Sequence, residues 1–100
     1  MSGPIFLGTD MKDPEVVPYF TWDAPLSVRE IQQRLSVPDA ERYRLLGKIL
    51  REARDTDVWA FTSPGFISSN WERLKPHLGR RRAFWEWLLK RLREEGLLVD

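Results

Sequence analysis

The chain has 100 residues, of which 42% are hydrophobic, and its 16 basic and 15 acidic side chains leave a net charge of +1. This length and composition indicate one globular domain with a modest core and exclude a disordered chain. The near-neutral charge argues against a strongly basic nucleic-acid-binding domain, and the absence of cysteine excludes disulfides and thiolate metal sites.

The apolar stretch nearest the N-terminus, Ile5-Phe6-Leu7, is short and has no basic residue before it. It is too short for a signal peptide, and no stretch of the chain approaches the length of a membrane span. We therefore expect a cytoplasmic protein without a membrane partner.

Residues 1–18 are predicted to form an irregular or mobile arm, because they show no helical period and contain Gly3, Pro4, Gly8, Pro14 and Pro18. Met11 is a candidate natural start, so the sequence leaves open whether residues 1–10 are native. The aromatic segment 19–23 is expected to be extended, with its rings against the helices. Residues 19–100 are expected to form a single helical domain.

Two helices are predicted next. Ser27-Val28-Arg29-Glu30 matches a capping box, which predicts a helix over about residues 28–35. Pro38 and the acidic residues after it favour the start of a second helix that runs to about Arg54. Gly47 lies in the middle of this helix, where glycine costs about 1 kcal/mol relative to alanine. We therefore expect another backbone or ring to approach Gly47 closely.

Asp55-Thr56-Asp57 is expected to be a turn, and residues 58–61 either a helical turn or an extended link. Thr62 or Ser63 is expected to cap a third helix over about 64–74, and a fourth helix is predicted over about 80–95, ending at Gly96. The expected fold class is all-α: a four-helix domain of two helical hairpins, about 26–54 and 62–96, with an irregular aromatic N-terminal arm.

The sequence offers few groups for catalysis. The single histidine, His77, lies between Pro76 and Leu78, and we expect it to pack or to cap a helix end. Asp55 and Asp57 have a spacing that can hold Mg²⁺, but no glycine-rich phosphate loop accompanies them, so solvated acids in a turn are expected. If the chain were an enzyme or an enzyme subunit, these three residues would be its only catalytic candidates. We expect no enzymatic activity, no cofactor and no metal.

The segment from Arg80 to Trp87 carries three consecutive arginines and three large aromatic residues. Cations at a helix N-terminus oppose the helix macrodipole, which is more readily tolerated where an anion or acidic partner is present. One interpretation is a solvated basic helix start; the other is a surface that recognises acidic side chains or phosphates. Trp87 is either a core residue or an exposed anchor. The predicted partner-binding residues are Arg80, Arg81, Arg82, Trp87 and Arg91.

Four blocks of the sequence together resemble a helical family of small bacterial proteins often encoded beside a nucleotidyltransferase toxin of the AbiEii/AbiGii type. The blocks are Tyr19-Phe20-x-Trp22-Asp23, the segment from Leu46 to Ala53, Asp57-Val58-Trp59-x-Phe61, and the segment from Leu78 to Leu88. The resemblance covers about residues 19–98. It implies a non-enzymatic, antitoxin-like partner for that nucleotidyltransferase and carries over no catalytic residues.

A second possibility is a small DNA- or RNA-binding module that acts as an autoregulator, because aromatic rings among arginines can stack on single-stranded bases. The near-neutral net charge argues against it. The sequence leaves open the identity of the partner, whether binding inhibits or assists it, and the oligomeric state.

Overall fold

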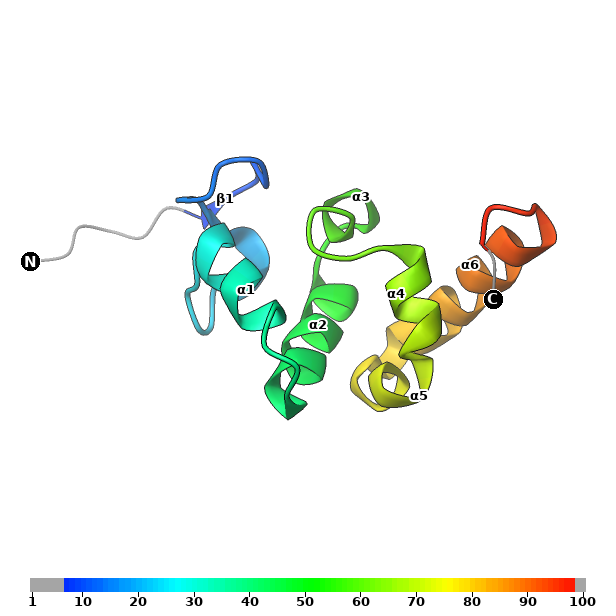
Figure 1. Ribbon diagram of the computed structural model, residues 1–100. Helices are drawn as coiled ribbons and strands as arrows, with labels where there is room; N and C mark the ends of the chain where they lie inside the picture. The colour runs from blue at the N-terminus through cyan, green and yellow to red at the C-terminus, as the bar shows by residue number, and fades with distance from the viewer. Residues whose placement is uncertain (1–6, 99–100) are drawn as a thin grey trace, which may run out of the picture.

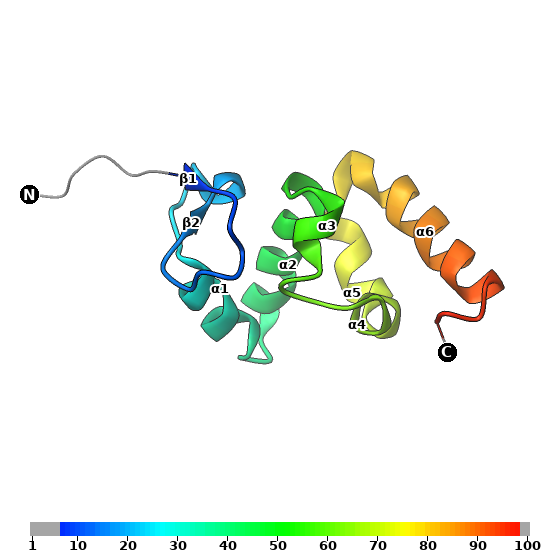
Figure 2. The same cartoon turned by 90° about the horizontal axis from the view of Figure 1, so that it is seen from above.

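The computed structural model describes residues 7–98, and over this range the chain is mostly helical. The α-helices are α1 (Val28–Leu35), α2 (Ala40–Glu52), α3 (Asp55–Val58), α4 (Pro64–Ser69), α5 (Trp71–Leu74) and α6 (Arg82–Glu94). Short 3-10 helices are η1 (Tyr19–Thr21), η2 (Lys75–His77) and η3 (Gly79–Arg81). The helices follow one another along an elongated molecule of 52 × 25 × 23 Å, with α1 toward one end and α6 at the other (Figures 1 and 2). The expectation of an all-α fold is confirmed, and no helix within residues 7–98 is long and apolar enough to cross a membrane.

Part of the predicted N-terminal arm is held against the start of α1. Strands β1 (Leu7–Gly8) and β2 (Val17–Pro18) form a short parallel pair, in which Leu7 is opposite Val17. The N–H groups of Val28 and Arg29 donate to the carbonyl oxygens of Val16 and Pro14 at 2.8 and 2.9 Å. Met11, between the strands, is buried in the core. Residues 1–6 of the predicted arm lie outside the described part of the chain.

The aromatic segment after the strands is not extended as predicted, because residues 19–21 form the helical turn η1. The hydroxyl of Thr21 closes this turn by donating to the carbonyl oxygen of Pro18 at 3.0 Å. The turn directs the ring of Phe20 into the core, edge-to-face with Phe61 at 5.9 Å between centroids. It leaves Trp22 69% exposed.

Local capping signals account for the first two helices. In α1 the Ser27 hydroxyl accepts from the Glu30 N–H at 3.1 Å, and a Glu30 carboxylate oxygen accepts from the Ser27 N–H at 3.0 Å, so the predicted capping box is confirmed. In α2 the Asp39 carboxylate accepts from the Arg42 N–H at 3.1 Å. Gly47 of α2 faces His77 of η2, which confirms the predicted close approach.

Three predicted elements differ in the structure. Residues 55–58, expected as a turn at their start, form the one-turn helix α3. The helix expected over 64–74 begins after the N-cap Ser63 but is interrupted at Asn70, whose side-chain amide donates to the carbonyl oxygen of Phe66 at 2.9 Å. The last α-helix begins at Arg82 rather than at residue 80, because Gly79 has a φ of 51° and residues 79–81 form the separate turn η3. The predicted stop at Gly96 is confirmed by its φ of 74°.

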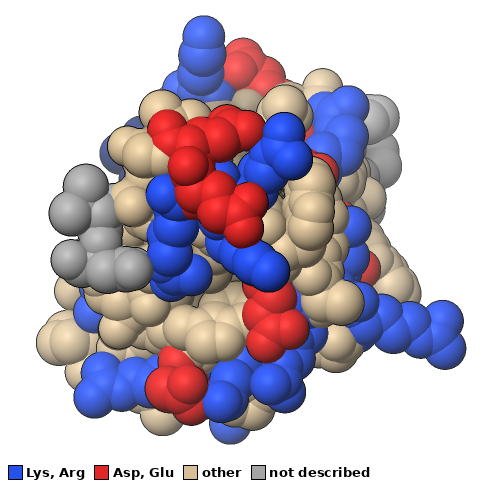
Figure 3. Space-filling model, turned by 90° about the vertical axis from the view of Figure 1, so that its right-hand side faces the viewer, with Lys and Arg blue, Asp and Glu red and all other residues tan. Residues whose placement is uncertain are grey.

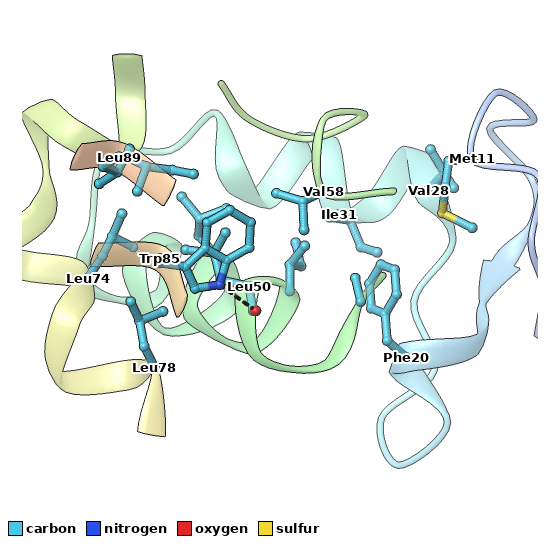
Figure 4. Packing of buried hydrophobic residues seen from close by; sticks show 14 of the residues in the cluster. Met11, Phe20, Val28, Ile31, Leu50, Val58, Leu74, Leu78, Trp85 and Leu89 are labelled. Carbon is cyan, nitrogen blue, oxygen red and sulfur yellow. Dashed lines mark hydrogen bonds between the residues drawn. The ribbon is translucent and has the colours of Figure 1, made fainter. Parts of the chain in front are cut away.

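The hydrophobic core runs the length of the molecule, and Trp85 of α6 lies fully buried within it (Figure 4). The indole N–H of Trp85 donates to the carbonyl oxygen of Leu50 in α2 at 2.9 Å, so its one polar group is satisfied inside the core. The same core cluster contains apolar side chains from every α-helix from α1 to α6, including Ile31, Ile49, Val58, Ile67, Leu74 and Leu89.

Candidate functional site

The predicted partner-binding residues lie on η3, which packs against α2, and on α6, which runs from there to the end of the molecule remote from the N-terminal strands. We call these residues, Arg80, Arg81, Arg82, Trp87 and Arg91, the Arg80–Trp87 surface. All of them are exposed except Arg81, which is half-buried. Seen from this end, basic and acidic side chains alternate and no single patch of one sign dominates (Figure 3). The surface is therefore charged in both senses rather than uniformly basic.

Three of the four guanidinium groups have acidic partners within the chain. Arg81 forms a salt bridge with Asp55 of α3, and its guanidinium also lies 4.2 Å from the centroid of the Phe84 ring. Arg82 pairs with Glu86 at 3.8 Å, and Arg91 pairs with Glu95 at 2.8 Å. In each pair the acidic residue follows the arginine by four positions. Exposed pairs of this kind contribute about 0–1 kcal/mol to stability. They can therefore exchange for an outside carboxylate at little cost.

Arg80 differs from its neighbours. Its guanidinium is exposed and forms no salt bridge or side-chain hydrogen bond within residues 7–98. It extends from η3, where the chain has not yet entered α6. Arg80 is thus the cation of this surface that is most available to an anionic partner.

A series of aromatic rings connects the core to the surface. Trp85 makes edge-to-face contacts with Trp59 and Phe84, at centroid distances of 5.8 and 5.1 Å. Phe84 in turn lies 6.1 Å from Trp87. Trp59 is 39% exposed and Trp87 is 56% exposed, whereas Trp85 is sealed in the core. Trp87 is therefore not a core residue, and its indole is open to solvent.

The exposed indole borders a small hollow. Trp87, Lys90, Arg91 and Glu94 line a depression of about 140 Å³ on the outer face of α6. A depression of this size next to an exposed ring can accept one side chain of a partner. It lacks the depth of a typical small-molecule pocket, which is about 300–1,000 Å³.

The residues weighed as catalytic candidates have structural partners. Asp57 accepts a hydrogen bond from the Tyr19 hydroxyl at 2.6 Å and pairs with Arg54 at 3.1 Å. Because Asp55 also pairs with Arg81, the expectation that these acids are simply solvated in a turn is wrong. Within residues 7–98, no three His, Asp or Glu side chains come together in a way that would hold a metal ion.

His77 packs against α2. Its Cβ faces Gly47, and its backbone carbonyl accepts a hydrogen bond from the Arg51 guanidinium at 2.7 Å. The expectation that this histidine has a packing role is confirmed. The contact with Arg51 also fixes η2 to the second half of α2.

The structure contains a larger hollow that the sequence did not single out. It has a volume of about 520 Å³ and lies between η1, α1 and α2, with Arg34, Arg44, Lys48 and Arg51 among its lining residues. The sequence contains one sign of this hollow. Steps of four and three place Arg44, Lys48 and Arg51 on one face of a helix. The apolar lining from outside α2 could be found only in the folded chain.

No protein-family model matches the chain, and neither a curated protein nor a solved structure matches it. Function must therefore be argued from the geometry of the surfaces described above.

Proposed function

We propose that this protein is a non-enzymatic, cytoplasmic interaction protein that binds an acidic protein partner through the Arg80–Trp87 surface. The observation that carries the proposal is the indole of Trp87, which is 56% exposed in a segment where the Arg80 guanidinium has no salt bridge to any described residue. Tryptophan and arginine are the residue types that most often dominate binding energy at protein interfaces.

The physical gain comes from two sources. Covering the exposed part of Trp87 removes apolar area from water, worth about 25 cal/mol per Å². Arg80 meets a partner carboxylate without first breaking an internal salt bridge, and Arg91 lies beside the hollow next to Trp87. In a tight complex, Trp87 would thus be the apolar anchor, and carboxylates of the partner would surround it.

The proposed partner is the nucleotidyltransferase that the sequence resemblance implies, with the present chain as its antitoxin-like companion. In this proposal the chain consists of two helical hairpins, about residues 26–54 and 62–96, and the second presents the binding surface. The modest size of the Arg80–Trp87 surface suits an interface with a few dominant anchors.

Titration calorimetry with the nucleotidyltransferase encoded beside this gene tests the proposal. Trp87→Ala and Arg80→Glu should each weaken binding about 30-fold, which corresponds to a loss of about 2 kcal/mol at an interface anchor. Trp22→Ala is the matched control for loss of an exposed indole, since Trp22 is 69% exposed near the other end of the molecule. Lys12→Glu is the control for charge reversal at an exposed cation.

Binding that survives the double variant Arg80→Glu/Trp87→Ala would overturn this assignment of the surface. If the chain instead binds its own promoter DNA, with an affinity that falls steeply with added salt, the nucleic-acid-binding alternative replaces it. Thermal melts of every variant show whether a loss of binding reflects a loss of fold.

A further inference from the structure

The hollow between η1, α1 and α2 is a concave feature that the Arg80–Trp87 surface does not use. Its volume of about 520 Å³ falls within the range of about 300–1,000 Å³ that is usual for ligand sites. Its lining combines an apolar floor with a charged rim. Each part restricts what the hollow can bind.

The floor of the hollow includes Leu26, Val37 and Leu45. Val37, in the link between α1 and α2, is 49% exposed, and the two leucines are half-buried. These side chains come from three separate parts of the fold and together supply the apolar part of the lining, which is open to water. A ligand with apolar side chains would displace this water favourably.

The rim is predominantly basic. Arg34 comes from α1, and Arg44, Lys48 and Arg51 come from one face of α2. Asp39 and Glu41 are the acidic residues of the lining, so the hollow keeps an excess of positive charge. A ligand for this rim must be acidic.

The cations of the rim differ in whether they already pair with groups of this chain. Arg44 pairs with Glu41 at 3.0 Å, both largely exposed, and Lys48 pairs with Asp23. Arg51 donates to the carbonyl oxygen of His77 and pairs with Glu52 at 3.6 Å. Arg34 is exposed and has no salt bridge within residues 7–98. Arg34 and Arg44 are therefore the cations that an incoming carboxylate reaches most easily.

We propose that this hollow binds an acidic amphipathic segment of a partner protein. Leucine or aromatic side chains of the segment would cover Val37 and Leu45, and its carboxylates would meet Arg34 and Arg44 on the rim. This is the arrangement by which an amphipathic helix fills a groove. Binding at this hollow does not depend on whether the Arg80–Trp87 surface holds a partner.

A nucleic acid fits this hollow less well than an acidic peptide. Single-stranded bases bind by stacking on aromatic rings, and the hollow has no aromatic residue in its lining. Phosphates would also meet the carboxylates of Asp39 and Glu41 at the rim. An amphipathic peptide instead uses the apolar floor and the cations together.

Fluorescence anisotropy with three labelled probes tests the proposal. The first is a peptide of alternating Glu-Glu and Leu-Leu pairs, about 12 residues long, which spans about 18 Å as a helix. The second is polyglutamate of equal length, and the third is single-stranded oligo-dT. We expect the Glu/Leu peptide to bind at least about tenfold more tightly than either other probe, a difference of about 1.4 kcal/mol.

Variants localise the binding. Val37→Glu places a negative charge on the floor and Arg34→Glu reverses an exposed rim cation; both side chains are exposed, so the fold should be retained. Each should weaken peptide binding at least about tenfold. Lys12→Glu, an equal change of charge away from the hollow, and Trp87→Ala, at the Arg80–Trp87 surface, should leave it unchanged.

The proposal is overturned if Val37→Glu binds the Glu/Leu peptide as tightly as the parent chain, or if the peptide does not bind at all. Polyglutamate binding as tightly as the peptide would show that the floor is unused, and tighter binding of oligo-dT would indicate a nucleic-acid site. Loss of peptide binding in Trp87→Ala would place the peptide on the other surface. The Val37→Glu variant should still bind the nucleotidyltransferase. Measuring that binding distinguishes a failure of the peptide site from a failure of the proposed function.

Discussion

Gly47 of α2 packs directly against His77 of η2. A Cβ atom at Gly47 would lie 2.3 Å from the Cβ of His77 and 3.4 Å from its carbonyl oxygen. Helix α2 therefore carries a residue of poor helix propensity because only glycine lets η2 come this close. The contact brings the Arg51 guanidinium to the His77 carbonyl, at 2.7 Å, and places η3 just beyond it.

Gly47→Ala should destabilise the protein although alanine is the better helix former. The gain in helix propensity is about 1 kcal/mol, whereas overpacking a tight contact costs about 1–3 kcal/mol. Urea unfolding followed by circular dichroism measures the balance. Gly65→Ala in α4 is the matched control: its nearest neighbouring atom would be the Ser63 hydroxyl oxygen at 4.0 Å, so this change should stabilise by about 0.5–1 kcal/mol.

A second-site change identifies the contact. The closest atom to an added methyl group is the Cβ of His77, which His77→Ala retains and His77→Gly removes. In the Gly47→Ala background, only His77→Gly should relieve the clash. Equal stability of Gly47→Ala and the parent chain would show that η2 moves aside without cost.

Tyr19→Phe should lower the free energy of unfolding by about 1–3 kcal/mol, because it leaves partly buried polar groups without their partner. The hydroxyl donates to Asp57 at 2.6 Å and accepts from the Arg54 N–H at 2.7 Å. Tyr43→Phe is the control and should cost less, since the Tyr43 hydroxyl donates to Asn70 over a longer 3.3 Å and accepts from the exposed guanidinium of Arg73 at 3.0 Å. An equal loss in both variants would contradict this ranking.

The same tyrosine predicts a dependence on high pH. Burial raises the pKa of Tyr19 above its ordinary value of 10.0, outweighing the opposite effect of the Arg54 N–H, and the bond to Asp57 adds to the rise. The folded state thus favours the neutral hydroxyl. This contribution to stability is complete below pH 10 and is lost as the pH rises through the raised pKa. As the pH rises above 10, the free energy of unfolding should therefore decrease more steeply for the parent chain than for Tyr19→Phe.

Ser27→Ala should cost about 0.5–2 kcal/mol by removing the N-cap of α1. Hydrogen bonds from Ser27, first from its backbone N–H, lower the pKa of Glu30 below 4.5. The stabilisation from the ionised carboxylate is therefore present above pH 4.5 and lost as the pH falls through the lowered pKa. Acid titration of the unfolding free energy checks this, and Glu30→Gln should remove that part of the pH dependence. An unchanged acid limb in Glu30→Gln would contradict the assignment.

Substitution of Trp85 should destabilise the protein much more than substitution of Trp87, although the two residues are only two positions apart. Trp85→Phe replaces the buried indole by a smaller ring and leaves the Leu50 carbonyl without its hydrogen-bond donor. The free energy of unfolding should therefore fall by about 2–4 kcal/mol. Trp87→Ala changes a side chain that is 56% exposed and should cost no more than about 1 kcal/mol. Denaturant midpoints measure both, and a large loss in Trp87→Ala would mean that this indole stabilises the fold.

Several features of the fold could be predicted because they depend on neighbours in the chain. The capping box at Ser27, the stop at Gly96 and the misfit of Gly47 within a helix each follow from local backbone geometry. The sequence placed the aromatic residues correctly on the last helix, whereas Arg80 and Arg81, expected there too, lie on the separate turn η3. It could not decide whether Trp87 was buried, since that depends on which face of α6 the core covers.

What the sequence determined by itself is the helical class of the protein, the bounds of α1 and the stop of α6 at Gly96, because hydrogen bonds within about four residues decide them. The tertiary structure alone decided how the charged groups pair. Tyr19 meets Asp57 across 38 positions and Arg81 meets Asp55 across 26, and no local pattern encodes such partners. It also decided the hollow beside α2, whose floor forms only when η1, α1 and α2 pack together and leave apolar side chains open to solvent.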